Sequence, residues 1–111
     1  MKISVADRLR IGEFLPEKGD IITMESVKDI REKAGLTAKY IKENKITSKV
    51  EGDKSYFEWP KDIKDTDVLF DKFELNILKE NVAKMEKDEE ITELNVDLAK
   101  KIKTEDLTIS T

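Results

Sequence analysis

The sequence predicts a small single-domain protein of the α+β class, with about five helices, a β-hairpin and one or two very short strands. A chain of 111 residues fits one domain. Apolar residues recur at intervals of three and four residues along most of the chain, which is typical of amphipathic helices. One segment, ITSKVEGDKSYFEW, alternates around a glycine and indicates a hairpin.

The first predicted helix begins after Ser4, because Ser4 and Asp7 have the spacing of a helix cap. It ends before Pro16, since proline cannot continue a helix. Residues 20–23, with the sequence DIIT, follow a turn and contain two adjacent isoleucines. This pattern predicts a very short strand.

The next two helices meet at a corner in the stretch VKDIREKAGLTAKYIKE. Thr23 is the predicted cap of a helix over residues 24–34, whose inward-facing stripe is Met24, Val27, Ile30 and Ala34. Gly35 stands where a helix commonly ends with a positive φ. Thr37 then caps a second short helix that ends near residue 44.

The hairpin is predicted over residues 46–59, with its turn at Gly52 and Asp53. A two-residue turn pairs Glu51 with Lys54 and continues to the pair Ile46 and Trp59. This register gives the hairpin one apolar face, made of Ile46, Val50, Phe57 and Trp59. We expect that face, including the single tryptophan, to pack on the core.

The C-terminal half contains one further short strand, predicted at residues 67–70, and two helices. Asp71 and Glu74 have the spacing of a capping box and open the longest helix, which ends near Lys87. Thr92 is the predicted cap of the last helix, whose apolar stripe is Ile91, Leu94, Leu98 and Ile102.

Residues 1–103 therefore form the predicted domain, and residues 104–111, which lack periodicity, are predicted to be a flexible C-terminal tail. The N-terminal residues contain no apolar stretch of the kind found in signal peptides. No apolar run approaches the ~18 residues needed to span a bilayer. These features predict a cytoplasmic protein with no membrane partner.

Several kinds of chemistry are disfavoured by composition. The chain has no cysteine and no histidine, which removes disulfides, thiol nucleophiles, histidine bases and His- or Cys-ligated zinc. Residues 62–71 contain four carboxylates, Asp62, Asp65, Asp67 and Asp71. This segment lacks the glycine and the terminal glutamate of a calcium-binding loop, so a solvated loop is the better explanation. We therefore expect no enzymatic activity, no metal and no cofactor.

The order of helix, short strand, helical corner and hairpin is similar to a winged helix-turn-helix domain, which suggests DNA binding by the helix at 37–44 and the hairpin at 46–59. The phosphate contacts would come from Lys39, Lys42, Lys45, Lys49 and Lys54. The helix has no cluster of base-reading side chains, and the net charge is −4. A solvated lysine face is the favoured explanation of the same residues.

The long helix has two apolar sides. Phe73 and Ile77 lie almost opposite its main stripe at ~100° per residue. Exposed apolar residues surrounded by charge would mark a protein interface. A helix that is buried on both sides near its start is the favoured explanation, because two residues make a small patch.

The segments RLRIGEFLPEKGDIITMESVKDIREKAGLT and VLFDKFELNILKENVAKMEKDEEIT, separated by a glycine hairpin, make residues 3–103 resemble a group of small uncharacterised bacteriophage and prophage proteins. The resemblance implies a phage or mobile-element origin and a small accessory role, without an activity. We therefore expect a non-enzymatic protein that binds a host or phage protein, with DNA binding as the alternative. The oligomeric state stays open.

Overall fold

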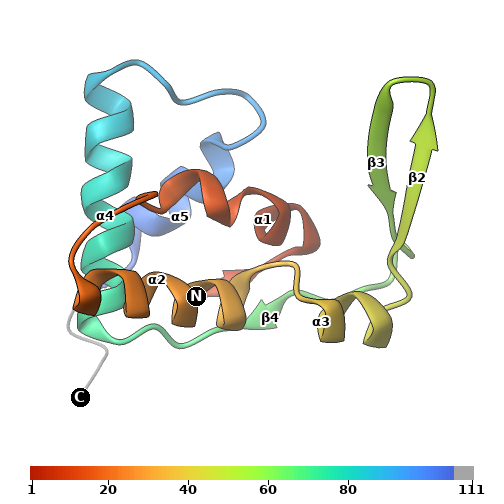
Figure 1. Ribbon diagram of the computed structural model, residues 1–111, viewed down its shortest axis with the longest axis horizontal. Helices are drawn as coiled ribbons and strands as arrows, with labels where there is room; N and C mark the ends of the chain where they lie inside the picture. Colours follow the sequence, from red (N-terminus) through yellow and green to blue (C-terminus); the bar gives the residue numbers. More distant parts are fainter. Residues whose placement is uncertain (107–111) are drawn as a thin grey trace.

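The computed structural model describes residues 1–106 and confirms a small α+β fold (Figure 1). Helices make up about half of the described residues, and the strands form two separate antiparallel pairs. In chain order the elements are β1 (Lys2–Ile3), α1 (Val5–Arg10), the 3₁₀ helix η1 (Ile11–Phe14), α2 (Ile21–Ala34), α3 (Ala38–Glu43), β2 (Thr47–Glu51), β3 (Lys54–Glu58), β4 (Thr66–Asp67), α4 (Lys72–Lys87) and α5 (Val96–Thr104).

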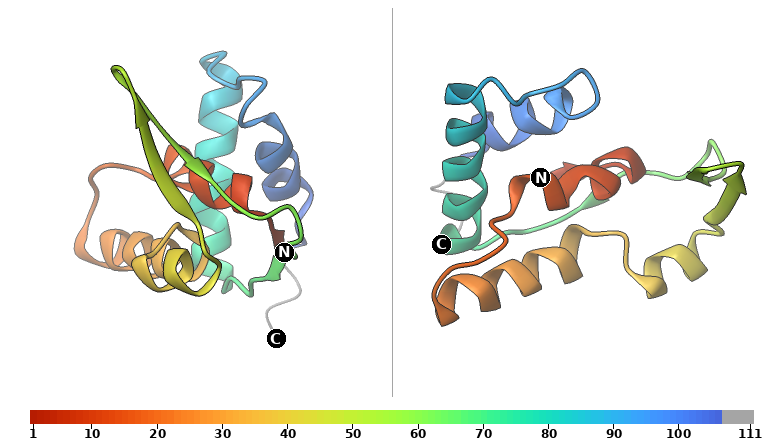
Figure 2. Two further views of the ribbon diagram at one scale, coloured as in Figure 1. Left: turned by 90° about the vertical axis from the view of Figure 1, so that its right-hand side faces the viewer. Right: turned by 45° about the horizontal axis from the view of Figure 1, so that its top comes forward.

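One hydrophobic core lies between α2, α4, α5 and the segment from β1 to η1 (Figures 1 and 2). Phe14 and Leu78 are completely buried in it. The other buried members are Ile3, Ile11, Leu15, Val27, Ile30, Ala34, Val68, Phe70, Leu75, Ile77, Val82, Leu98, Ala99 and Ile102. These residues come from both halves of the chain, so the two halves fold as one unit.

The smaller sheet joins the N-terminus to the segment that precedes α4. Lys2 lies opposite Asp67 and Ile3 lies opposite Thr66. The strand predicted at residues 67–70 is therefore displaced toward the N-terminus, and Val68 and Phe70 serve as buried core residues instead. The strand β4 is short because its partner β1 has only two residues, Lys2 and Ile3, with which to pair.

Three predicted helix caps are confirmed. Ser4 and Asp7 exchange side-chain bonds with each other's backbone N–H groups at the start of α1, as a capping box does. The Thr37 hydroxyl accepts a bond from the backbone N–H three residues into α3. Asp71 and Glu74 form the second capping box, and α4 extends to Lys87 as predicted.

The start of α2 differs from the prediction. The helix begins at Ile21 because the Asp20 carboxylate accepts a hydrogen bond of 2.8 Å from the Thr23 backbone N–H. The strand predicted at residues 20–23 is therefore wrong, and so is the assignment of Thr23 as the cap. Both isoleucines are exposed in the first helical turn, where the N-cap decides the local structure and β propensity does not.

Gly35 ends α2 for a different reason from the one predicted. Its φ is −86°, so no left-handed conformation is involved. A Cβ at this position would collide with the Arg31 carbonyl oxygen. Glycine is thus favoured by close backbone approach at the α2–α3 corner.

The last helix starts later than predicted, at Val96. Thr92 and Asn95 bond to each other's backbone N–H groups and close a turn before the helix. Asn95 is buried because its amide nitrogen also donates to Glu13 of η1 at 2.9 Å. This long-range bond fixes the turn, and Leu94, predicted to face inward, is exposed.

The first residues of the predicted tail belong to the folded part of the molecule. Thr104 is the last residue of α5, and the Glu105 carboxylate lies 3.5 Å from the N-terminal amine. The rest of the predicted tail, residues 107–111, lies outside the described residues. In the part that the structure describes, no helix combines the length and apolarity needed to cross a membrane.

The pH dependence of Asp20 capping can be tested. The hydrogen bond from the Thr23 backbone N–H, and then that from its side chain, lowers the pKa of Asp20 from its ordinary value. A carboxylate with a lowered folded-state pKa stabilises the fold fully above the unfolded pKa, and this contribution disappears as pH falls through the folded pKa. Asp20→Asn should therefore be less stable than wild type at pH 7, by a margin that shrinks toward pH 3.

Urea unfolding at several pH values measures this margin. Asp29→Asn, in the middle of the same helix, is the matched control and should show little effect at any pH. A margin for Asp20→Asn that is the same at pH 7 and pH 3 would contradict the role of the charged cap.

Candidate functional site

An arm projects from the compact body of the protein. It consists of α3 and the β2–β3 hairpin, residues 38–58. Figure 1 and the right-hand view of Figure 2 show the hairpin standing away from the other helices. Every residue of β2 and β3 is exposed. The hairpin therefore presents both its faces and both its edges to solvent.

The base of the arm is held by Arg8 of α1. Its buried guanidinium lies 3.9 Å from the centre of the Tyr40 ring of α3 and donates a 2.8 Å hydrogen bond to the Gly35 carbonyl. Burial lowers the pKa of Arg8 from its usual value, since it disfavours the charged form. On the other side of α3, the Ile46 backbone N–H donates to the carbonyl of Ile41. These contacts fix where the hairpin leaves the body.

The predicted register of the hairpin is confirmed from Glu51 and Lys54 at the turn to Thr47 and Glu58 at the base. Gly52, the first residue of the turn, has a φ of 64°, a conformation that glycine adopts without strain. The apolar and polar faces are therefore assigned as predicted.

The position of the apolar face is not as predicted. Ile46 is buried, but Val50, Phe57 and Trp59 are 75%, 37% and 36% exposed. The prediction that this face, with Trp59, packs on the core is wrong, because the hairpin leaves the body directly after Ile46. The helices and β1–β4 form the core without it. Val50 is thus displayed on the arm, and about a third of each of the two aromatic residues is accessible to solvent.

The sequence contains a signal for this arrangement. Ser48 and Ser55 lie on the same face as Val50 and Phe57 and alternate with them across the two strands. A face that packs on a core seldom interrupts its apolar residues with hydroxyls that have no buried partner. The serines therefore indicate a face that stays partly in water.

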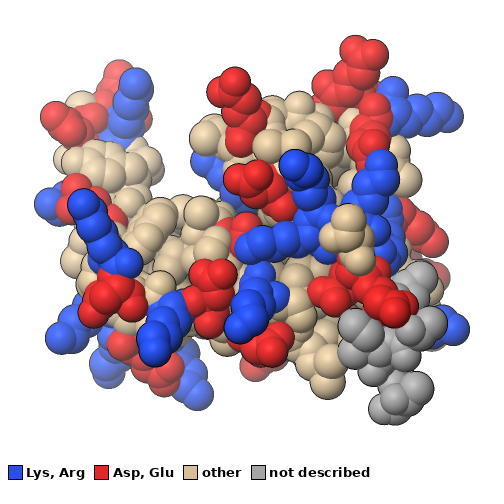
Figure 3. Space-filling view, turned by 180° about the vertical axis from the view of Figure 1, so that it is seen from behind, with Lys and Arg blue, Asp and Glu red and all other residues tan. Residues whose placement is uncertain are grey.

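The structure brings all five predicted nucleic-acid contacts, Lys39, Lys42, Lys45, Lys49 and Lys54, onto the arm. Lys39 lies 4.0 Å from Glu43, and Lys49 lies 2.9 Å from Glu58. Five lysines against four carboxylates in residues 38–58 leave the arm a net charge of +1. The charges of both signs are interspersed where the arm is seen from behind in Figure 3.

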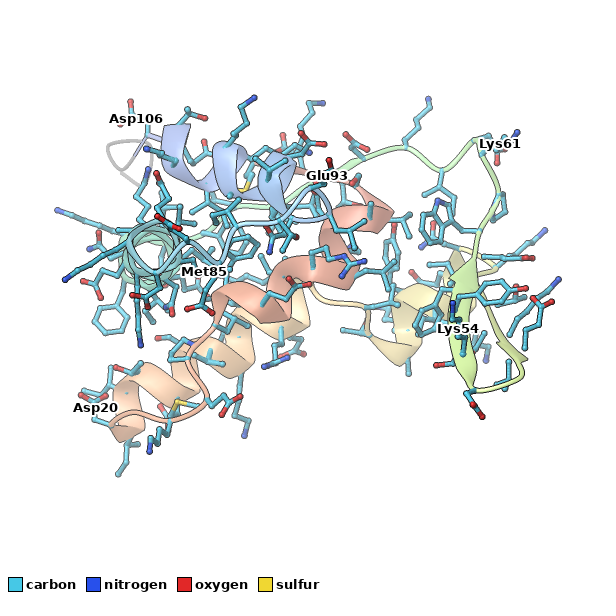
Figure 4. The ribbon with its side chains drawn as sticks, turned by 90° about the horizontal axis from the view of Figure 1, so that it is seen from above. Asp20, Lys54, Lys61, Met85, Glu93 and Asp106 are labelled. Atoms are coloured by element: carbon cyan, nitrogen blue, oxygen red, sulfur yellow. The ribbon has the colours of Figure 1, made fainter. Side chains whose placement is uncertain are left out.

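Lys54 of the hairpin lies at one end of the view from above, while Asp20 and Met85 lie toward the other (Figure 4). The arm is thus a separate surface with a mixed charge pattern and an exposed apolar face. This combination is typical of a surface that contacts another protein, where aromatic side chains supply most of the binding energy.

The structure separates the two residues of the other predicted interface. Phe73 is 47% exposed at the start of α4, whereas Ile77 is 7% exposed and belongs to the core. The interface hypothesis is therefore wrong for Ile77, and its burial agrees with the favoured explanation of a helix that is buried on both sides near its start. α4 contacts both α2 and η1, and the ion pair between Lys33 and Glu74 joins its first turn to α2.

A groove of about 370 Å³ lies between α4 and α5. Its apolar part comes from Val82, Ile91, Val96 and Ala99. Lys103 and Glu86 form an ion pair of 3.0 Å beside it. No aromatic side chain lines this groove, whereas the arm carries Phe57 and Trp59.

The carboxylates of residues 62–71 do not form one cluster, because Asp67 and Asp71 make different contacts. Asp71 caps α4, and Asp67 of β4 lies 3.4 Å from the N-terminal amine. Within residues 1–106 no three acidic side chains are grouped so that they could hold a metal ion.

Comparison of the chain with family models, with curated proteins and with solved structures found no match.

The difference between Phe73 and Ile77 predicts different effects on stability. Ile77→Ala should lower the free energy of unfolding by about 2–5 kcal/mol, because it leaves a cavity in the core. Phe73→Ala should cost about 1 kcal/mol or less, since its ring is already half in water. Urea unfolding of both variants measures the difference, and equal losses would show that the two side chains are equally buried.

Proposed function

We propose that this protein is non-enzymatic and acts by binding another protein through the arm. The observation that carries the proposal is the exposure of Val50, Phe57 and Trp59 on a hairpin that projects from the body. A free protein gains little from holding large apolar side chains in water, whereas a partner that covers them gains their burial.

The surroundings of these three residues support the same proposal. Ser48 and Ser55 lie beside them on the same face, and charged side chains of both signs occupy the opposite face of the hairpin. Polar residues likewise surround the apolar centre of protein interfaces. Trp59 and Phe57 are fixed on a paired β-strand or directly after it, so a partner orders little additional backbone on binding. The arm therefore has the composition and the rigidity of a binding element.

The partner is proposed to be a host or phage protein, in a cytoplasmic setting. The support is the resemblance of residues 3–103 to small phage and prophage proteins and their accessory role. The absence of histidine and cysteine supports a binding role over catalysis.

DNA binding by the arm is the second candidate. One observation favours it, namely that the structure gathers Lys39, Lys42, Lys45, Lys49 and Lys54 on one projecting element. The carboxylates among them reduce the electrostatic attraction that phosphate binding requires. Protein binding is therefore the function we favour.

Capture of partners from the native host tests the first candidate. The double variant Val50→Ser/Phe57→Ser should lose the captured protein, because it removes the apolar surface that the partner covers. Leu69→Ser and Leu94→Ser, each at an apolar residue as exposed as Val50 but outside the arm, are the matched controls and should retain it.

Circular dichroism and thermal unfolding establish that each variant is folded. All four substituted side chains are exposed, so melting temperatures should change little. Retention of the partner by the double variant would place the binding surface elsewhere on the protein.

A titration with duplex DNA at 50 mM and 200 mM salt tests the second candidate. If the arm binds phosphates, affinity should fall steeply with salt and should be lost in Lys39→Glu/Lys42→Glu/Lys45→Glu. The matched control is a triple reversal on the other end of the molecule, Lys84→Glu/Lys87→Glu/Lys100→Glu. Flat titrations of the wild-type protein at low salt would exclude DNA binding.

A further inference from the structure

The hairpin of the arm has two unpaired edges. β2 and β3 pair with each other, and neither pairs with another described strand. A free strand edge presents backbone N–H and C=O groups that can pair with a second chain. Which residues present these groups follows from the register.

Glu51 and Lys54 flank a two-residue turn, so they form a hydrogen-bonded pair. Hydrogen-bonded and non-hydrogen-bonded pairs alternate along an antiparallel ladder. Tyr56 and Glu58 therefore also direct their backbone groups toward β2. Ser55 and Phe57 direct theirs outward, along the open edge of β3.

We propose that a second copy of this chain pairs with this edge, β3 against β3, as an antiparallel two-fold dimer centred on Tyr56. In this register Ser55 lies opposite Phe57 of the second copy. Both residues have outward-facing backbone groups, so each of the two Ser55–Phe57 pairs exchanges two hydrogen bonds. The result is a continuous four-stranded sheet in the order β2, β3, β3, β2.

Charge complementarity supports this register. It places Lys54 opposite Glu58 of the second copy, and Glu58 opposite the second Lys54. Within each hairpin, Lys54 already lies opposite Glu51. Lys54 thus stands between two carboxylates across three neighbouring strands, and opposite charges directly across a strand pair stabilise a sheet.

The other edge is less suitable for self-pairing. The equivalent register for β2 is centred on Lys49 and brings Lys49 directly against its copy. Since the backbone groups of Lys49 face β3, this pair is non-hydrogen-bonded, the arrangement that holds side chains closest. Like charges directly opposite each other destabilise strand pairing. The charges of the hairpin therefore favour β3 over β2.

This inference rests on the proposed function, because it takes the arm as a protein-binding element. It assigns the open edge of β3 to a second copy of the chain. The edge is distinct from the face that carries Val50, Phe57 and Trp59. In the dimer Phe57 lies diagonally across from its copy, within the reach of aromatic rings. The dimer therefore joins two apolar faces into one larger surface and leaves it open to another protein.

Charge reversal tests the register by sedimentation equilibrium of the full chain at low salt. Lys54→Glu brings only carboxylates together across the dimer, and Glu58→Lys brings only lysines together. Each variant alone should weaken dimerisation by about tenfold or more, because two attractive pairs become repulsive. An equimolar mixture of the two variants should dimerise again, since every lysine then meets a carboxylate.

The double variant Lys54→Glu/Glu58→Lys restores both pairs across the dimer with reversed sign and should dimerise more strongly than either single variant. A glutamate at position 54 then faces Glu51 within each hairpin, so its dimer should be weaker than that of wild type. The double variant also controls for the loss of the 2.9 Å ion pair between Lys49 and Glu58 within the hairpin. A wild-type protein that is monomeric at millimolar concentration would overturn the inference. So would single variants that associate as wild type does, or a mixture that remains monomeric.

A backbone substitution tests which edge is used. Ser55→Pro removes an outward-facing N–H from β3, a position where an edge strand accepts proline, and should abolish the dimer. Ser48→Pro makes the same change on the open edge of β2 and should leave the dimer intact. The opposite pattern would overturn the assignment to β3.

The two proposals fail separately. A strictly monomeric wild type that still loses its host partner in Val50→Ser/Phe57→Ser contradicts the dimer and supports the proposed function. A dimer that follows the charge rules, together with unchanged capture by that double variant, supports the inference and contradicts the proposed binding face.

Discussion

The position of the arm depends on one buried cation. Arg8 reaches from α1 to the corner between α2 and α3, where it donates to the Gly35 carbonyl and faces the Tyr40 ring. None of the ion pairs within residues 1–106 involves Arg8, so its burial is balanced by a carbonyl dipole and an aromatic ring. Each of these is worth about 2 kcal/mol when water is excluded, against a desolvation cost of several kcal/mol. Arg8 therefore contributes more to the direction of α3, and so of the hairpin, than to overall stability.

Structure that depends on nearby residues could be predicted from the sequence. The caps at Ser4, Thr37 and Asp71 need only a side chain and a backbone N–H two or three residues away, and all three were predicted correctly. The start of α2 was missed because two adjacent isoleucines suggest a strand, whereas Asp20 is the stronger local determinant. The start of α5 could not be predicted, since it depends on a bond from Asn95 to Glu13, 82 residues away.

The candidate site was predictable in its internal geometry and not in its placement. Alternation and the glycine turn were enough to give the register of the hairpin and the composition of its faces. Whether the apolar face of the hairpin packs on the core depends on how much apolar surface the helices bury against one another. The local sequence pattern of the hairpin gives no information about that buried area. The same limit explains Ile77, which lies opposite the main stripe of α4 and is buried by other elements. Ser48 and Ser55 were the one local indication of an exposed face.

Glu74 gives the molecule a further property. Its buried carboxylate accepts a hydrogen bond from the Asp71 backbone N–H and also lies 2.6 Å from the Lys33 ammonium group of α2. The same oxygen thus closes the first turn of α4 and joins that helix to α2. Helix ends ordinarily fray independently of the rest of a protein. Here fraying also breaks the contact with Lys33, so amide protons at the start of α4 should exchange with solvent more slowly than those at the start of α2, whose capping residue Asp20 is exposed.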